Sequence, residues 1–186
     1  MKTAITQPWI EEGYRIFAYE GRAGLKVERL SKRIGKNKSS FYHHFADMNL
    51  FMEVLLEYHL QQAHQMAEKE MNCSSQKELV DVLIDHKIDL LFSRQLRIHR
   101  NNSDFETCFL KTNQITVPAI KGIWAEMLGL QQQIYLAELV FQLTLENFYL
   151  QITDETLNEI WLNNYITQLR TLIKAFQTKA TSDVQS

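Results

Sequence analysis

Basic and hydroxyl side chains gather in residues 26–45, KVERLSKRIGKNKSSFYHHF, and these side-chain types suit contacts with a polyanion. Lysines bind phosphate groups as point charges, whereas small serines let a backbone come close and can hydrogen-bond phosphates or bases. Tyrosine and histidine add a phenol and an imidazole that can bond to phosphate oxygens. We therefore predict a DNA-contacting set consisting of Lys26, Lys36, Lys38, Ser39, Ser40, Tyr42 and His43.

The apolar spacing around these residues predicts two short helices. Val27, Leu30, Ser31 and Ile34 recur at i, i+3, i+4 and i+7, which indicates a helix over about 27–34 with one inward stripe. Gly35 is expected to form the turn, and Asn37 to cap a second helix that runs to about His44. The basic side chains Arg29, Lys32 and Arg33 are then expected to face water or a polyanion, and Phe41 and Phe45 to turn inward.

Charge is distributed unevenly along the chain. Residues 1–45 hold nine Lys and Arg against four Glu, a net charge of +5, whereas the whole chain of 186 residues has a net charge of −2. A basic segment attached to an acidic remainder is typical of a protein with a nucleic-acid-binding head. We predict a helix-turn-helix domain over residues 1–46, followed by a larger helical domain over 47–186 that binds an effector and dimerises. The alternative is a solvated basic face on an ordinary helical domain.

The remaining sequence predicts an all-α fold of about nine helices. The first helix is expected over about 7–20, with Pro8 in its first turn and Gly21 at its end. Asp47, Ser75 with Glu78, Ser103 with Glu106, and Asp154 are the predicted N-terminal caps of later helices. These helices are expected over about 48–71, 76–93, 103–129 with a kink or restart at Pro118, 131–151 and 154–177.

The last two predicted helices carry more apolar surface than one neighbour can cover. A hairpin of this kind can pair with its copy and form a four-helix dimer interface. The alternative is that both helices belong to the core of a monomer. The residues predicted for the dimer interface are Leu139, Leu143, Trp161, Tyr165, Leu169 and Leu172.

Residues 9–58 resemble the DNA-binding domain of the TetR (tetracycline-repressor-like) transcriptional regulators. The most specific part of the resemblance is the run from Lys38 to Phe45, KSSFYHHF. The resemblance implies a homodimer that binds a near-palindromic double-stranded operator, and a pocket in the second domain whose small-molecule effector releases repression. The residues that match in their spacing are Phe17, Gly21, Val27, Leu30, Gly35, Lys38, Tyr42, His43 and Phe45.

Four positions depart from the family pattern. Leu25 and Lys26 stand where small hydroxyl residues usually cap the second helix, and Met48 stands where a lysine is common. Ser31 replaces the usual alanine. Leu25, Lys26 and Met48 motivate an alternative function, a helical interaction or sequestration module whose DNA-binding head is degenerate.

Aromatic residues are the main candidates for an effector pocket. Each of them can equally be ordinary core or surface, because aromatic residues at helical spacing are common in cores. The predicted ligand-binding residues are His86, Phe92, Phe105, Phe109, Asn113, Trp124, Phe141 and Phe148, with Gln114, Asn147 and Tyr149 as further candidates.

The residue pattern gives no indication of a catalytic site or a metal site. His59 and His64 are five residues apart and do not share a helix face, and no phosphate-binding glycine loop or nucleophile elbow is present. Cys73 and Cys108 are too few for a disulfide framework. We therefore expect no catalytic residues, no metal, no cofactor and no membrane partner, and a cytoplasmic location, since the sequence has neither a signal peptide nor a membrane-length apolar run.

Overall fold

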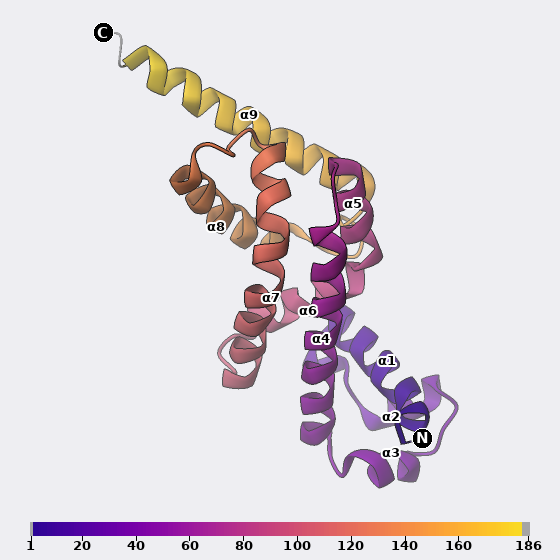
Figure 1. Cartoon of the computed structure of the whole chain (residues 1–186). Helices are drawn as coiled ribbons and strands as arrows, with labels where there is room; N and C mark the ends of the chain where they lie inside the picture. The colour runs from indigo at the N-terminus through magenta and orange to yellow at the C-terminus, as the bar shows by residue number, and fades with distance from the viewer. Residues whose placement is uncertain (1, 184–186) are drawn as a thin grey trace.

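The computed structural model describes the backbone of residues 2–183 and the side chains of residues 5–177, and its described part is all-α (Figure 1). This confirms the predicted fold class, because the described residues form nine α-helices and one 3₁₀ turn. The helices are α1 Lys2–Glu20, α2 Val27–Arg33, α3 Lys38–Phe45, α4 Met48–Met71, α5 Gln76–Asp85, α6 Lys87–Ile98, α7 Ser103–Met127, α8 Ile134–Gln151 and α9 Glu159–Asp183, and the 3₁₀ turn η1 is Arg22–Gly24.

The chain forms an elongated molecule with its N-terminal helices at one end. In Figure 1, α1, α2 and α3 lie at the lower end, and α8 and α9 lie at the opposite end. Helix α4 links the two ends: its 24 residues correspond to about 36 Å at 1.5 Å per residue. Within residues 2–183, every helix is too short or too polar to cross a lipid bilayer.

Side-chain caps set several helix starts where the sequence predicts them. Asn37 caps α3, Asp47 caps α4 by accepting bonds from two backbone N–H groups, and Ser75 caps α5. Two predicted caps are wrong. The cap of α7 is Asn102, one residue before the predicted Ser103, and its side chain accepts from the N–H groups of residues 104 and 105.

The second wrong cap is Asp154, because α9 begins only at Glu159. Thr153 and Thr156 exchange hydrogen bonds that hold residues 153–156 in a turn instead of a helix. The Asn158 side chain then accepts a hydrogen bond from the backbone N–H of Trp161. Hydroxyl side chains that bond to nearby backbone groups offer the chain this alternative to a helix.

Three other predicted boundaries differ from the structure. Helix α1 begins at Lys2, so Pro8 lies inside it and removes only one backbone bond near the start. The predicted helix over 76–93 is two helices that meet at His86, and the change of direction lets α6 pack on α1. Pro118 does not restart α7, which continues as one helix to Met127.

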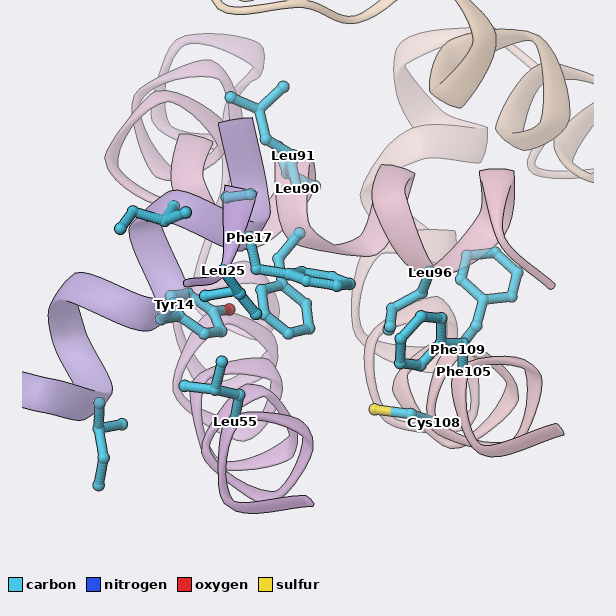
Figure 2. Packing of buried hydrophobic residues seen from close by; sticks show 14 of the residues in the cluster. Tyr14, Phe17, Leu25, Leu55, Leu90, Leu91, Leu96, Phe105, Cys108 and Phe109 are labelled. Atoms are coloured by element: carbon cyan, nitrogen blue, oxygen red, sulfur yellow. The ribbon is translucent and has the colours of Figure 1, made fainter. Parts of the chain in front are cut away.

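The larger of two apolar clusters joins the N-terminal helices to the rest of the chain. Figure 2 shows Tyr14, Phe17 and Leu55 facing side chains of α6 and α7, including Leu96 and Phe105. Phe17 is fully buried, and burying one such side chain is worth about 2–3 kcal/mol. The head formed by α1–α3 therefore rests on apolar contacts that cross the predicted domain boundary at residue 46.

The connection between α3 and α4 is strained. Ala46 has φ 47° and ψ −57°, a combination that L-residues rarely adopt, and it is the one non-glycine residue with positive φ in residues 2–183. The N–H of Asp47 donates to the carbonyl of Phe45, which makes the connection a γ-turn of the rare, positive-φ kind. Only Ala46 and Asp47 separate the two helices.

Candidate nucleic-acid interface and ligand cavity

Helix α3 presents two chemically different faces. Phe41 and Phe45 are buried, and Phe41 packs edge-on against Trp9 at 5.4 Å and Phe51 at 5.2 Å between ring centroids. Tyr42, next to Phe41 in the chain, is 53% exposed, and His43 is exposed as well. The inward and outward faces are as the sequence predicts, and the outward face is available to a partner.

The first turn of α3 is ordered by one side chain. Asn37 Oδ1 accepts hydrogen bonds of 2.8 Å from the backbone N–H of Ser40 and from the Ser39 hydroxyl. Lys38 lies at the same end and is exposed, with its Nζ 2.7 Å from Glu28 Oε1 on α2. This ion pair between exposed groups is weak and can be exchanged for a phosphate contact.

The arginines of α2 are partly exposed, as predicted, and each also pairs with a carboxylate of α1. Arg29 forms a bidentate ion pair with Glu20, and Arg33 bonds to Glu12 at 2.7 Å. The Arg29 guanidinium lowers the pKa of Glu20. These arginines fasten α2 to α1, whereas the exposed Lys26, Lys32 and Lys36 form no ion pair with any residue between 5 and 177.

Two of the four positions that depart from the family pattern contribute to the core. Leu25 is buried in the core and Met48 packs against that core. Lys26 occupies the N-cap position of α2 without a side-chain cap bond, so that helix starts uncapped. The buried Ser31 hydroxyl has no hydrogen-bond partner among the described side chains and backbone.

A cavity of about 100 Å³ lies among α4, α5, α6, α7, α8 and α9. Of the predicted ligand-binding residues, Trp124, Phe141 and Phe148 line it, as does the further candidate Tyr149. His86, Phe92, Phe105, Phe109 and Asn113 do not line it; Phe92, Phe105 and Phe109 belong instead to the core shared with α1. The lining is almost entirely apolar, with Leu79, Leu83, Leu145, Leu162 and Ile166 among its residues.

A buried hydrogen-bond network joins α1 to α4 and α6. The Tyr14 hydroxyl lies 2.6 Å from His59 Nδ1 and donates to Asp89 Oδ1 at 2.7 Å. Asp89 Oδ2 lies 2.6 Å from His86 Nδ1. Ser93 Oγ lies 3.0 Å from His59 Nε2. Because the Tyr14 proton is used on Asp89, neutral His59 carries its own proton on Nδ1 and accepts from Ser93 at Nε2.

Burial controls the protonation of this network. It lowers the pKa of the His59 imidazole to about 4, so the ring is neutral near pH 7. Burial, and then the neighbouring Asp89 carboxylate, raises the pKa of the Tyr14 phenol. Burial also raises the pKa of the Tyr149 phenol, which lines the cavity, to about 12. The network therefore holds a neutral imidazole on α4 between Tyr14 of α1 and Ser93 of α6.

Glu70 is the one acidic residue among the described residues that line the cavity. Its side chain is 1% exposed, and its Oε2 has no hydrogen-bond partner among the described residues. Burial raises the pKa of this carboxyl to about 8.

Two comparisons with known proteins found relatives. The chain is 28% identical over 123 residues to the HTH-type transcriptional repressor AcnR of Corynebacterium diphtheriae; the match covers 64% of this chain and 55% of that protein. The chain thus spans about half the length of this curated relative. A crystal structure of a TetR-family transcriptional regulator from Rhodococcus sp. superposes with a TM-score of 0.51 at 15% identity, over 93% of this chain and 98% of that chain. No protein-family model matches.

The chain has the TetR-family fold. The resemblance predicted from the motif around Lys38–Phe45 is confirmed by the curated relative and the solved structure.

In this TetR-family fold, the residues predicted for a dimer interface lie in two environments. Leu139, Leu143 and Leu172 are exposed on α8 and α9. The ring of Trp161 stacks on that of Tyr165 with 5.1 Å between centroids. Tyr165 and Leu169 also line the cavity, so part of the predicted interface faces inward.

Three polar residues that the fold brings together, Tyr14, His59 and Asp89, were not predicted, and neither was Glu70, which lies apart from them in the cavity. The first three come from α1, α4 and α6, and Tyr14 is 75 residues from Asp89. Glu70 lies in the polar run AEKEM, which gives no local sign of burial. The available signal was the position of His59 on the apolar side of its helix, between Leu55 and Met66.

Proposed function

We propose that this chain is a DNA-binding transcriptional regulator that acts as a repressor, is a homodimer and is released from its operator by a small molecule. The observation that carries the proposal is the outward face of α3, where Lys38, Tyr42 and His43 are exposed beside a capped first turn. A second helix presented in this way is the element that enters the major groove in helix-turn-helix proteins. The curated relative is named a transcriptional repressor, which supports the same function here.

Exposed apolar side chains on α8 and α9 support a homodimer. A soluble monomer rarely leaves so many large apolar groups on two adjacent helices, and a second copy of the same surface would cover them. The side chains are Ile134, Tyr135, Leu139, Leu143, Leu150, Ile160, Leu172 and Phe176.

The cavity and α4 support regulation by a small molecule. Glu70 lies near one end of α4, while the other end is separated from α3 by two residues. A ligand that fits the cavity better in one arrangement of α4 would bias the position of α3 through that helix. The hydrogen bond between Tyr14 on α1 and His59 on α4 is a second physical connection between α4 and the head.

The test of DNA binding is selection from a random duplex library, followed by anisotropy titration of the selected DNA at several salt concentrations. We expect a near-palindromic site and a linear fall of log affinity with log salt. The double variant Lys38→Ala with Tyr42→Ala should lose about tenfold or more in affinity, since two contacts near the groove are removed. Lys111→Ala, an exposed lysine on α7, is the matched control and should bind as the unmodified chain does.

Failure to enrich any sequence, or weak binding that ignores salt, would contradict the proposal. That outcome would favour the interaction or sequestration module, for which the uncapped α2 and the intramolecular pairs of Arg29 and Arg33 are the supporting observations.

The test of the dimer is sedimentation of the Leu143→Glu variant, with Leu110→Glu on α7 as the control. Both leucines are exposed, at 71% and 54% respectively. We expect Leu143→Glu alone to shift the protein to monomer, because it places a charge in the apolar interface. A dimer that survives this change, or a monomeric unmodified chain, would contradict the proposed interface.

A further inference from the structure

The carboxyl group of Glu70 lies where a negative charge is unfavourable. Glu70 is the second-last residue of α4, where the negative end of the helix dipole opposes a negative charge. Its side chain is 1% exposed and makes no side-chain hydrogen bond with the described residues. Burying an unpaired carboxylate is costly, and the carboxyl keeps its proton instead, with a pKa of about 8.

The rest of the cavity supplies no partner for this group. No Lys, Arg or His lines the cavity among the described residues. Three polar lining groups use their protons elsewhere: Thr116 on a backbone carbonyl of its own helix, Thr144 likewise, and Tyr165 on the Thr144 carbonyl. The fourth, Tyr149, forms no hydrogen bond with Glu70 in the structure. Glu70 is therefore the acidic acceptor left over in an otherwise apolar space.

We propose that the cavity binds a small lipophilic amine whose ammonium group pairs with Glu70 and whose apolar tail lies against Trp124, Phe141 and Phe148. This rests on the proposed function insofar as such a ligand would be the effector. An ammonium group brings three donors and the positive charge that the site lacks.

The chemistry of the lining excludes other small ligands as good fits. A carboxylate ligand would meet a second carboxyl group and no cation. A neutral alcohol of the same shape would fill the apolar part but gain only one hydrogen bond from Glu70. Size also limits the ligand: a cavity of about 100 Å³ is of the order of one that holds a benzene ring. An amine with a tail of about six carbons is therefore the appropriate probe.

The experiment is calorimetric titration of the full chain, without DNA, with n-hexylamine, 1-hexanol and hexanoate. We expect the amine to bind at least about tenfold tighter than the alcohol, and hexanoate not to bind measurably. Equal affinity for amine and alcohol, or no binding of the amine, would overturn the proposal. This comparison uses the unmodified protein and does not depend on the folding of any variant.

Two variants then assign the effect to one carboxyl group. Glu70→Gln keeps the shape of the side chain and should lose at least about tenfold in affinity for the amine while its affinity for the alcohol stays the same. Glu68→Gln is the matched control, because Glu68 lies on the same helix and is exposed. An amine preference that survives in Glu70→Gln would overturn the assignment.

Failure of this inference can be told apart from failure of the proposed function. Salt-dependent DNA binding that is intact, combined with no preference for the amine, would reject the ligand class and leave the regulator unaffected. Amine binding with no DNA binding would reject the DNA-binding regulator and leave the assignment of the ligand class intact.

Discussion

The outward face of α3 and the cavity beside the far end of α4 differ in where their polar groups lie relative to the core. On α3, Lys38, Tyr42 and His43 are exposed, and the core residues Phe41 and Phe45 are separate from them. In the cavity, Glu70 is inside the core itself. The contrast shows that polar side chains for binding cost little folding free energy on the exposed face of a packed helix. The same kind of group costs much more when it is buried without a partner.

The largest expected effect tests the separation of the two faces of α3. Phe41→Ala should lower the free energy of unfolding by about 3–5 kcal/mol, because Phe41 is fully buried against Trp9, Phe45 and Phe51. Tyr42→Ala should lower it by less than about 1 kcal/mol while weakening DNA binding. Urea unfolding measures both. Comparable losses of stability in the two variants would show that the faces are not separate.

The second effect measures the cost of enclosing Glu70. Its folded pKa of about 8 lies above the ordinary value of 4.5, so its contribution to stability is complete below pH 4.5 and is lost as pH rises through 8. We expect the free energy of unfolding to fall by about 4 kcal/mol over this range relative to Glu70→Gln. The titratable groups near Glu70 are Cys73, Tyr149 and Tyr165, and each has a raised pKa, so they stay neutral in this window. A difference that does not change with pH would contradict the enclosed state of Glu70.

The third effect has the opposite sign and comes from His59. Its folded pKa of about 4 lies below the ordinary 6.5, so its contribution is present above pH 6.5 and is lost as pH falls toward 4. We expect a loss of about 3 kcal/mol on acidification relative to His59→Phe. Other groups that face His59 are Tyr14 on α1 and Asp89 on α6.

The windows of Glu70 and His59 overlap between pH 4.5 and 6.5 with opposite signs. The free energy of unfolding of the unmodified chain should therefore depend only weakly on pH in this range. In each variant it should change with pH as the other group, His59 or Glu70, dictates. Parallel stability profiles for the unmodified chain and His59→Phe would argue against a neutral, buried imidazole.

The smallest expected effect concerns the cap of α3. Asn37→Ala should cost about 1 kcal/mol, because the side chain accepts from the N–H of Ser40 and orders the first turn. Asn37→Ser should retain most of the stability, since serine also caps helix starts. Thermal unfolding of the two variants measures the difference. Equal losses of stability in both would show that the side-chain cap does not stabilise α3.

Features that depend on neighbouring residues could be predicted from the sequence, and features that depend on packing between distant helices could not. Asn37 and Asp47 were identified as caps because a cap acts over three residues, and the burial of Phe41 beside exposed Tyr42 follows from helical spacing. The ion pairs that use Arg29 and Arg33 were missed because their partners lie on another helix. Glu70 was missed because helices beyond residue 75 complete the cavity around it.

The γ-turn at Ala46 limits how α3 can move relative to α4. A connection of two residues with strained backbone has almost no freedom to absorb rotation, so α3 cannot reorient while α4 stays still. Any tilt of α4 must then swing the outward side chains of α3 through a similar angle. Lengthening this connection by a flexible residue would uncouple the two motions without touching a single residue of either the cavity or the exposed face of α3.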